Sequence, residues 1–349
     1  MARAPRPGEE LPIGAVDAWL KAQVPGLEGT PEVTQYSGGA SNWTYRLQYP
    51  SRDFVLRRPP AGTKAKSAHD MGREHRVQSA LRPHFPLVPA MVGLCEDEAI
   101  LGAPFYVMER VEGVIPRKDF PPGVRLSEAQ AATLCDAFVN TLVALHRVSP
   151  EASGLASLSR GPGYCRRQVE GWSDRYDRAR TWNVPRFRRV RAWLHDHTPV
   201  DVAACIIHND YRFDNLVLAQ DDPTRIVGVL DWEMATVGDP LMDLGGSLAY
   251  WVEAGDGPLA KALRRQPTHL PGMLTRRGLV EAYLERTGHR PASFAFYEVF
   301  GLFRLAVIAQ QIYYRYHHGQ TRNPAFKNLW LMVHYLSYRC RLAARSGRP

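Results

Sequence analysis

Hydrophobic and polar residues alternate with a period of two along the first third of the chain. Side chains of a β-strand point to the two faces of a sheet in turn, so such a run predicts a strand with one buried face. Five short runs have this pattern and are separated by turn residues: 33–36, 43–47, 54–57, 91–95 and 105–110. We therefore expect an antiparallel sheet in this region, with a glycine-containing loop after its first strand.

A helical period replaces the alternation in two places that adjoin this region. Residues 67–81 place apolar side chains on one stripe, and Pro83 follows them as a stop signal. A second helix is predicted to begin near Leu126, because Ser127 and Gln130 have the spacing of a capping box. The pattern therefore changes from a strand-rich segment with one helix to a helical segment.

The rest of the chain is predicted to be mostly helical. Helices are expected within 160–198, and residues 300–316 are apolar nearly all round and are followed by Gly319, a residue typical of a helix C-terminus. Three short apolar runs interrupt this segment and predict short strands: 205–207, 216–218 and 226–230. The pattern predicts an α+β protein with a small antiparallel β-sheet lobe that includes one helix and a larger, mostly helical lobe.

The length of 349 residues also favours two lobes over one small unit. We expect an N-terminal tail with room for one helix, a strand-rich lobe and a helical lobe, at 1–28, 29–110 and 111–349. The N-terminus has no apolar signal segment, and the apolar runs are shorter than a membrane span, which predicts a cytoplasmic protein. The five cysteines are scattered and form no C-x-x-C pair, which argues against a disulfide framework or a zinc site.

The segment from His208 to Asn215 carries the clearest chemistry in the sequence. It has a His-x-Asp-x4-Asn arrangement that includes Asp210, and Asp231 follows sixteen residues after Asn215, behind an apolar run. Kinase-like catalytic loops use an Asp to orient the attacking hydroxyl and an Asn five residues later to bind Mg²⁺. The spacing therefore predicts a phosphoryl-transfer site.

The order of these pieces resembles the aminoglycoside phosphotransferase and choline kinase-like family, which shares the protein-kinase fold. Within that family the sequence is most similar to the kinase-like domains associated with acyl-CoA dehydrogenases. The resemblance rests on five segments: residues 55–60 (VLRRPP), 73–77 (REHRV), 94–97 (LCED), 104–109 (PFYVME) and 230–233 (LDWE). It implies a bilobal fold and an ATP-dependent transfer of the γ-phosphoryl group to a hydroxyl.

Two kinds of role follow for the helical lobe. A carboxylate beside the attacking hydroxyl can align it and accept its proton, which is the role expected of Asp210, whereas His208 is expected to hold the turn. Asn215 and Asp231 offer the oxygen ligands that Mg²⁺ prefers. Glu233 is left open between a contact with metal or substrate and a surface salt bridge.

The strand-rich lobe is expected to bind the nucleotide. Backbone groups of the loop after the first strand would cover its phosphates, at Gly38, Gly39, Ala40, Ser41 and Asn42. The third strand of the family normally ends in a Lys that pairs with a helix Glu, and Arg57 takes that place, with Glu74 as its expected partner. Residues from Glu109 to Glu112, including Val111, would form the hinge to the purine, which favours ATP and leaves GTP open.

The formal charge of +9 is concentrated rather than spread. Nine arginines lie between residues 164 and 191, which is either a solvated helical face or an anion site. Interleaved aromatics and recognised nucleic-acid motifs are lacking, so we expect no nucleic-acid partner. An anionic acceptor such as a hydroxyacyl-CoA fits better than an aminoglycoside, and four arginines are candidates to bind it: Arg166, Arg167, Arg175 and Arg178.

Three interpretations therefore stay open at this point. The first is an active kinase for a small hydroxyl compound, with ATP and Mg²⁺ as cofactors. The second is a catalytically idle nucleotide-binding module, because Arg57 replaces the usual Lys. The third keeps the kinase chemistry but assigns it an aminoglycoside or choline-type acceptor.

Overall fold

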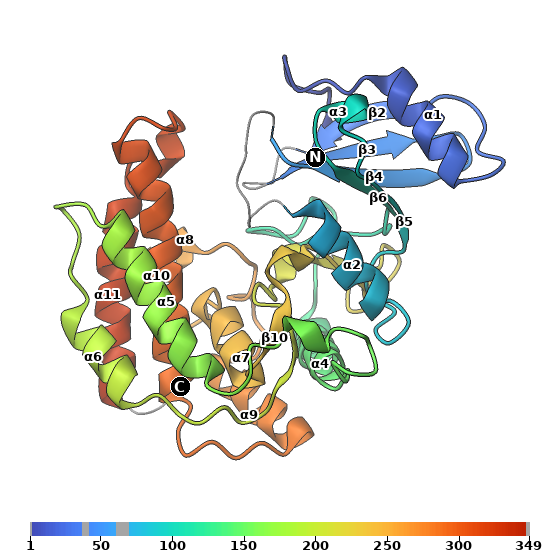
Figure 1. The fold of residues 1–349 in the computed structure, drawn as a ribbon. Coiled ribbons are helices and arrows are strands. Elements are labelled where there is room, and N and C mark those ends of the chain that lie inside the picture. Colours follow the sequence, from blue (N-terminus) through green and yellow to red (C-terminus); the bar gives the residue numbers. More distant parts are fainter. Residues whose placement is uncertain (1, 37–41, 61–69, 347–349) are drawn as a thin grey trace. The chain divides into compact units, whose positions relative to one another are not determined.

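A computed structural model describes residues 2–36, 42–60 and 70–346 of the chain (Figure 1). The chain divides into two compact units. Unit 1 contains residues 1–113 and also residues 227–233, whereas unit 2 contains residues 114–226 and 234–349. The chain therefore returns to unit 1 at residues 227–233, which a single boundary near residue 110 does not describe.

Unit 1 is built on a six-stranded antiparallel sheet. Its strand order is β1-β2-β3-β4-β6-β5. The strands are β1 (Ala2–Arg3), β2 (Glu32–Tyr36), β3 (Trp43–Gln48), β4 (Asp53–Arg58), β5 (Met91–Cys95) and β6 (Phe105–Glu109). The five strands expected from the period of two are confirmed. The central strands β4 and β6 are buried on both faces, because successive residues of each enter two different core clusters.

Helices cover both faces of this sheet. Helix α1 (Ile13–Gln23) buries Val16 and Leu20 in the core cluster that contains Tyr45 and Leu56, and α2 (Met71–Leu81) packs against β5 and β6. A short helix, α3 (Glu98–Leu101), lies between β5 and β6, and the side chain of Asp97 caps it by accepting the backbone N–H of Ala99. Arg57 and Arg58 end β4 and point to opposite sides of the sheet, as the strand period requires.

Unit 2 is mostly helical. Its helices are α4 (Glu128–His146), α5 (Tyr164–Ala179), α6 (Arg188–Asp196), α7 (Pro240–Ala249), α8 (Pro258–Leu263), α9 (Arg276–Thr287), α10 (Ala295–His317) and α11 (Leu329–Ser346). Short strands occur where apolar runs predicted them: β7 (Cys205–Ile207) and β8 (Leu216–Leu218), to which the structure adds β10 (Thr236–Gly238), the antiparallel partner of β7. The third predicted strand, β9 (Ile226–Val229), and the 3-10 turn Trp232–Met234 belong mostly to the segment of unit 1. Short 3-10 turns of unit 2 lie at Ala156–Leu158, Phe213–Asn215 and Pro324–Phe326.

Helix α10 is the centre of unit 2. It packs against α5, α7 and α11, and 83% of its most apolar stretch is buried (Figure 1). Among the described residues it is also the one helix long and apolar enough to cross a membrane, a property it shares with the core helices of globular proteins. Gly319 ends it with φ +71°, as the sequence predicted.

Helices α7 and α10 touch through two glycines. A Cβ on Gly301 would lie 2.1 Å from the carbonyl oxygen of Gly245, which is an overlap that no relaxation of a side chain could relieve. The backbones therefore approach closely only because both residues lack side chains. This contact fixes α10 beside the segment that carries the catalytic-loop motif.

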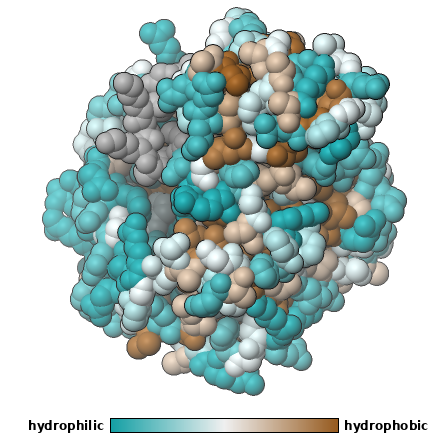
Figure 2. All heavy atoms as spheres, turned by 45° about the vertical axis from the view of Figure 1, so that its right-hand side comes forward, coloured by the Kyte–Doolittle hydropathy of each residue, from teal (hydrophilic) through white to brown (hydrophobic). Residues whose placement is uncertain are grey.

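The apolar residues are used mainly inside the two units. Figure 2 shows one face of the molecule, on which hydrophilic side chains predominate and hydrophobic ones form small groups. Burial of the large aromatic side chains in the interiors supplies most of the hydrophobic stabilisation of such folds.

Candidate active site

The predicted catalytic loop lies in unit 2, directly after β7. Tyr211 and Phe213 are fully buried against Phe138 of α4, with ring centroids 4.5 and 4.9 Å from it. Asp210 and Arg212 alternate with these two anchored residues, and their side chains meet each other rather than the aromatic core. The local sequence pattern therefore decides which side chains can meet a substrate.

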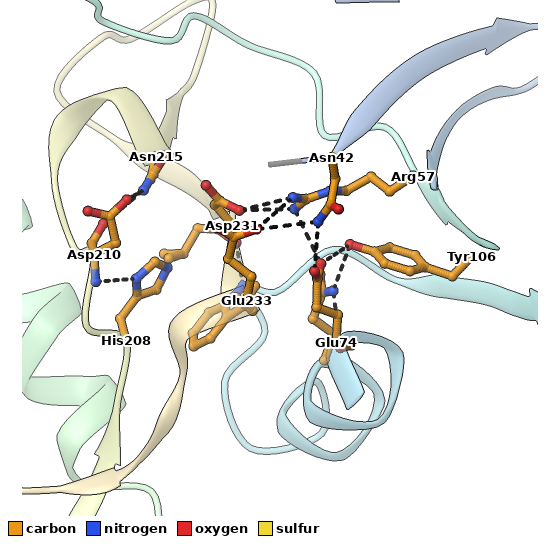
Figure 3. Close-up of polar contacts among 12 residues, drawn as sticks. Asn42, Arg57, Glu74, Tyr106, His208, Asp210, Asn215, Asp231 and Glu233 are labelled. Atoms are coloured by element: carbon orange, nitrogen blue, oxygen red, sulfur yellow. Dashed lines mark hydrogen bonds and ion pairs between the residues drawn. The ribbon is translucent and has the colours of Figure 1, made fainter. Parts of the chain in front are cut away.

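Asp210 is held at both of its carboxylate oxygens. The Asn215 amide donates to Oδ2 at 2.9 Å and to the Asp210 carbonyl oxygen at 2.8 Å, and the Arg212 guanidinium lies 3.1 Å from Oδ1 (Figure 3). Arg212 also pairs with Asp214 at 2.9 Å. The amide nitrogen of Asn215 faces Asp210, so its oxygen is left for another partner.

His208 supports the loop from within. Its side chain is fully buried, and its Nδ1 accepts a hydrogen bond from the backbone N–H of Asp210 at 3.2 Å (Figure 3). Asp243 of α7 accepts the backbone N–H groups of His208 and Asn209 at 2.8 and 2.7 Å. These contacts fit the supporting role expected of His208.

Asp243 is in turn held by His146. The His146 Nε2 lies 3.2 Å from its carboxylate. Burial raises the pKa of Asp243, but the hydrogen bonds from His146 and from the loop backbone outweigh burial and hold that pKa below its usual value. Asp243 is therefore an anion that fixes the loop backbone.

A second polar cluster lies in unit 1, around Arg57. Its guanidinium lies 3.1 Å from Oδ1 of Asp231 and 3.5 Å from one oxygen each of Glu74 and Glu233 (Figure 3). The expected pairing of Arg57 with Glu74 is thus present, and two further carboxylates join it. One guanidinium faces three carboxylates.

Glu74 is the most buried of these carboxylates. It accepts hydrogen bonds from Tyr106 at 2.8 Å and from the Asn42 amide at 3.1 Å. Burial raises the pKa of Glu74, and the charge of Arg57 works against that rise. The Asn42 amide also reaches Glu233 at 3.3 Å, so Asn42 binds carboxylates at the one described position of the predicted phosphate loop.

Asp231 follows β9 with φ +68°, a conformation that few non-glycine residues adopt. Trp232 anchors it, because this ring is fully buried and its Nε1 donates to the Val229 carbonyl oxygen at 2.8 Å. The strain at Asp231 is therefore maintained by the packing of its neighbour. Carboxylate oxygens of Asp231 and Glu233 are the hard ligands that fit Mg²⁺.

The other candidate residues of unit 1 belong to the predicted phosphate loop and the predicted hinge. Gly38, Gly39, Ala40 and Ser41 lie outside the described residues. Glu109 ends β6 and pairs with Arg52 at 2.6 Å, on the surface. Val111 packs against Gly228, where a Cβ would come within 2.9 Å of it.

The four candidate arginines all lie on α5 but have different surroundings. Arg167 donates to the carbonyl oxygens of Gly161 and Pro162 and so closes the turn before the helix. The Arg175 guanidinium lies 4.7 Å from the ring centroid of Trp172. Arg166 and Arg178 are exposed.

Sequence reasoning did not identify Arg212 or Arg304. Arg212 could have been noticed, since it stands between Asp210 and Asp214 in the loop. Arg304 is one of two arginines in the apolar run 300–316 and the one that is buried, and its Nη2 donates to the Asn209 carbonyl oxygen at 2.5 Å. A charge far from the end of an otherwise apolar helix was the available signal.

A group of acidic and thiol side chains near the start of α5 has a structural role. Cys165, Asp201 and Asp239 lie within 4.8 Å of one another. Each carboxylate already accepts three backbone N–H groups, those of residues 163, 164 and 165 for Asp201 and of residues 202, 241 and 242 for Asp239. These donors leave the carboxylates committed to loop and helix ends rather than to a metal.

The chain is similar to known phosphotransferases and to parts of acyl-CoA dehydrogenase family members. The model of the phosphotransferase enzyme family matches residues 32–279. Mouse acyl-CoA dehydrogenase family member 10 is 35% identical over 318 residues, which are 89% of this chain and 29% of that protein. For rat acyl-CoA dehydrogenase family member 11 the identity is also 35%, over 90% of this chain and 41% of that protein. The chain thus spans less than half the length of these relatives.

Solved structures show the same fold. A Ralstonia eutropha protein, provisionally named an aminoglycoside phosphotransferase, is 29% identical, has a TM-score of 0.81, and is covered to 99% by 97% of this chain. An aminoglycoside phosphotransferase in complex with AMP-PNP and hygromycin B is 16% identical, with a TM-score of 0.57 over 95% of this chain and 98% of that one. The kinase-like fold expected from the sequence is confirmed, and the chain belongs to the phosphotransferase enzyme family.

Proposed function

We propose that this protein is a kinase that transfers the γ-phosphoryl group of ATP to a hydroxyl group of a small anionic acceptor. The observation that carries the proposal is the geometry of Asp210, whose two oxygens are fixed by Asn215 and Arg212. A base held in one orientation can align an attacking hydroxyl and accept its proton as the new P–O bond forms. Family membership supports the same reaction class.

The residues of the two units have separate roles in this proposal. In unit 2, Asp210 orients the acceptor and Asn215 offers an amide oxygen to a metal. In unit 1, Asp231 offers a carboxylate to a metal and Arg57 offers positive charge to the nucleotide phosphates. Mg²⁺, when bound, would supply charge neutralisation on those phosphates.

Nucleotide use is supported by the AMP-PNP bound to a protein of the same fold. ATP is therefore the donor we propose, and GTP is the second candidate to compare with it. The relatives named for acyl-CoA chemistry support a hydroxyacyl-CoA or a related hydroxy compound as acceptor. The arginines of α5 support an acceptor that carries negative charge.

The test is an ADP-release assay with Mg²⁺ across hydroxyacyl-CoAs, hydroxy acids, sugars, choline and aminoglycosides. With the best acceptor, Asp210→Asn should lower kcat by about 10²- to 10⁴-fold, the usual contribution of a general base. Asp221→Asn, which removes an exposed carboxylate of the same unit, should leave kcat unchanged. Equal ADP release by the wild type and Asp210→Asn would contradict the kinase assignment.

A catalytically idle nucleotide-binding module is the second candidate, favoured by Arg57 in the place of the usual Lys. It predicts nucleotide binding by calorimetry without ADP release from any acceptor. The same assay, run beside a binding measurement, therefore separates the two functions.

A further inference from the structure

Helix α10 carries a buried positive charge in the middle of unit 2. Arg304 is 7% exposed, and its Nη2 donates a hydrogen bond to the Asn209 carbonyl oxygen. Among the described residues, no carboxylate forms an ion pair with Arg304. A buried guanidinium without a counter-ion is unusual, because transfer of an ion out of water costs several kcal/mol.

The neighbours of Arg304 compensate only part of this cost. Its guanidinium lies 5.3 Å from the ring centroid of Trp172 on α5, and α5 packs beside α10 (Figure 1). A cation–π contact contributes about 0.5–2 kcal/mol and one hydrogen bond to a charged group about 1.5–3 kcal/mol. These two contacts offset only part of the cost of burying the charge, so a bound anion would stabilise the site.

A second arginine lies over the same ring. The Arg175 guanidinium is 4.7 Å from the Trp172 centroid and, like Arg304, has no ion pair among the described residues. Burial lowers the pKa of Arg175, and the charges of Arg178 and Arg304 lower it further. Arg175 and Arg304 therefore repel each other over one aromatic ring, which is the arrangement that a bound anion would relieve.

Arg304 lies close to Asp210. Its Nη2 donates to the carbonyl of Asn209, the residue directly before Asp210, and consecutive Cα atoms are about 3.8 Å apart. Tyr250 lies near the same charges: its ring is 4.9 Å from the Arg212 guanidinium, and while burial raises the pKa of Tyr250, Asp210 raises it further and Arg304 lowers it. An anion at Arg304 would lie within a few bonds of a hydroxyl at Asp210.

We infer that Arg304 and Arg175 form an anion subsite around Trp172 that receives a negatively charged group of the acceptor itself. This inference rests on the proposed kinase function and narrows its substrate class. The acceptor is a hydroxyl compound with a carboxylate or phosphate group close to the hydroxyl, rather than a polycation. Arg304 supplies the buried end of the subsite and Arg175 its exposed rim.

The experiment measures inorganic phosphate and acetate binding by calorimetry, without Mg²⁺ or nucleotide. Arg304→Gln and Arg175→Gln should each weaken the binding of the preferred anion about 10-fold or more, which corresponds to one charge-assisted hydrogen bond. Arg304→Lys should retain part of the affinity that Arg304→Gln loses, because lysine keeps the positive charge but lacks the two-sided donor geometry of a guanidinium. Preference for phosphate or for acetate identifies the anionic group of the acceptor.

Two matched variants locate the binding. Arg189→Gln removes an exposed arginine of α6 with the same change in net charge and should leave the affinity unchanged. Arg58→Gln removes a guanidinium of unit 1 that lies over the Trp43 ring and should also leave the affinity unchanged. Equal affinity in Arg304→Gln, Arg175→Gln and the wild type would overturn the subsite.

The outcome does not depend on turnover. If Asp210→Asn fails to lower ADP release while phosphate binding maps to Arg304 and Arg175, the kinase assignment fails and the anion subsite stands. If Arg304→Gln does not fold, the exposed Arg175→Gln variant still decides the question.

Discussion

Two arginines, Arg57 in unit 1 and Arg304 in unit 2, have opposite electrostatic surroundings. Arg57 in unit 1 faces three carboxylates within 3.5 Å, so these four side chains carry a formal charge of −2. Arg304 in unit 2 has no carboxylate partner among the described residues and relies on one carbonyl and one aromatic ring. The positive charge of Arg57 is exceeded by the negative charge of its neighbours, whereas the charge of Arg304 is balanced by no carboxylate among the described residues.

This difference in charge predicts which kind of ion would stabilise each unit. Excess carboxylate around Arg57 is relieved by a cation, which agrees with Mg²⁺ as the expected cofactor. Uncompensated guanidinium at Arg304 is relieved by an anion, which agrees with an anionic acceptor. Each unit therefore has a charge imbalance that its proposed ligand would correct.

The largest expected effect comes from neutralising the two arginines in turn. Arg57→Met leaves three carboxylates without their cation and should destabilise unit 1 by about 3–5 kcal/mol, whereas Arg304→Met removes an unpaired buried charge and should cost less than about 1 kcal/mol in the absence of ligand. Native-state hydrogen exchange of β4 and of α10 measures the free energy of unfolding of each unit separately. Equal destabilisation by both variants would contradict the difference in charge balance between Arg57 and Arg304.

The second prediction uses pH. Burial already raises the pKa of Glu74, and Arg57→Met removes the charge that opposes this rise. A carboxyl with a raised folded-state pKa destabilises the protein above that pKa, and the penalty is relieved as pH falls through it. Between pH 7.5 and 5, Arg57→Met should recover on the order of 2 kcal/mol. Arg304→Met should show no such recovery, and hydrogen exchange at several pH values tests both.

The third prediction concerns metal. If the carboxylates of unit 1 bind a divalent cation, Mn²⁺ at about ten times its Kd should stabilise the wild-type unit by about 1.4 kcal/mol. Asp231→Asn should abolish this stabilisation, while Glu32→Gln, at an exposed carboxylate of β2, should retain it. Hydrogen exchange of β4 with and without Mn²⁺ is the measurement. Stabilisation that persists in Asp231→Asn would assign the metal to other ligands.

The smallest effect is expected at Arg58, which ends the same strand as Arg57. Its guanidinium lies 5.5 Å from the Trp43 ring on the other side of the sheet, away from the carboxylates. Arg58→Gln should therefore cost less than about 1 kcal/mol and leave Mn²⁺ stabilisation unchanged. A loss of Mn²⁺ stabilisation in this variant would show that net charge, rather than the position of Arg57, controls the cluster.

Much of the site could be predicted because its residues occur at characteristic intervals along the sequence. The interval from Asp210 to Asn215 predicted a loop in which both side chains act together, and the structure joins them by a 2.9 Å hydrogen bond. The strand period separated Arg57 from Arg58, and the helical segment supplied Glu74 as the partner of Arg57. These predictions needed only periodicity and neighbours along the chain.

Other features could not be predicted because they depend on contacts between distant segments. Arg304 reaches a carbonyl 95 residues earlier in the sequence, and only the close approach of α7 and α10 at Gly245 and Gly301 brings it there. The Arg57 cluster likewise joins β4 to Asp231 and Glu233, which are 174 residues or more away. Residue type and spacing do not reveal such meetings.

The sequence by itself determined the α+β organisation, the family and the Asp210 loop, because strand period, capping box and motif spacing are local properties. The tertiary structure alone decided the charge balance around Arg57 and Arg304. That balance depends on which distant carboxylates enter the same low-dielectric surroundings, where an unpaired charge is costly. The anionic class of acceptor that we propose rests on that balance, and it is tested most directly at Arg304.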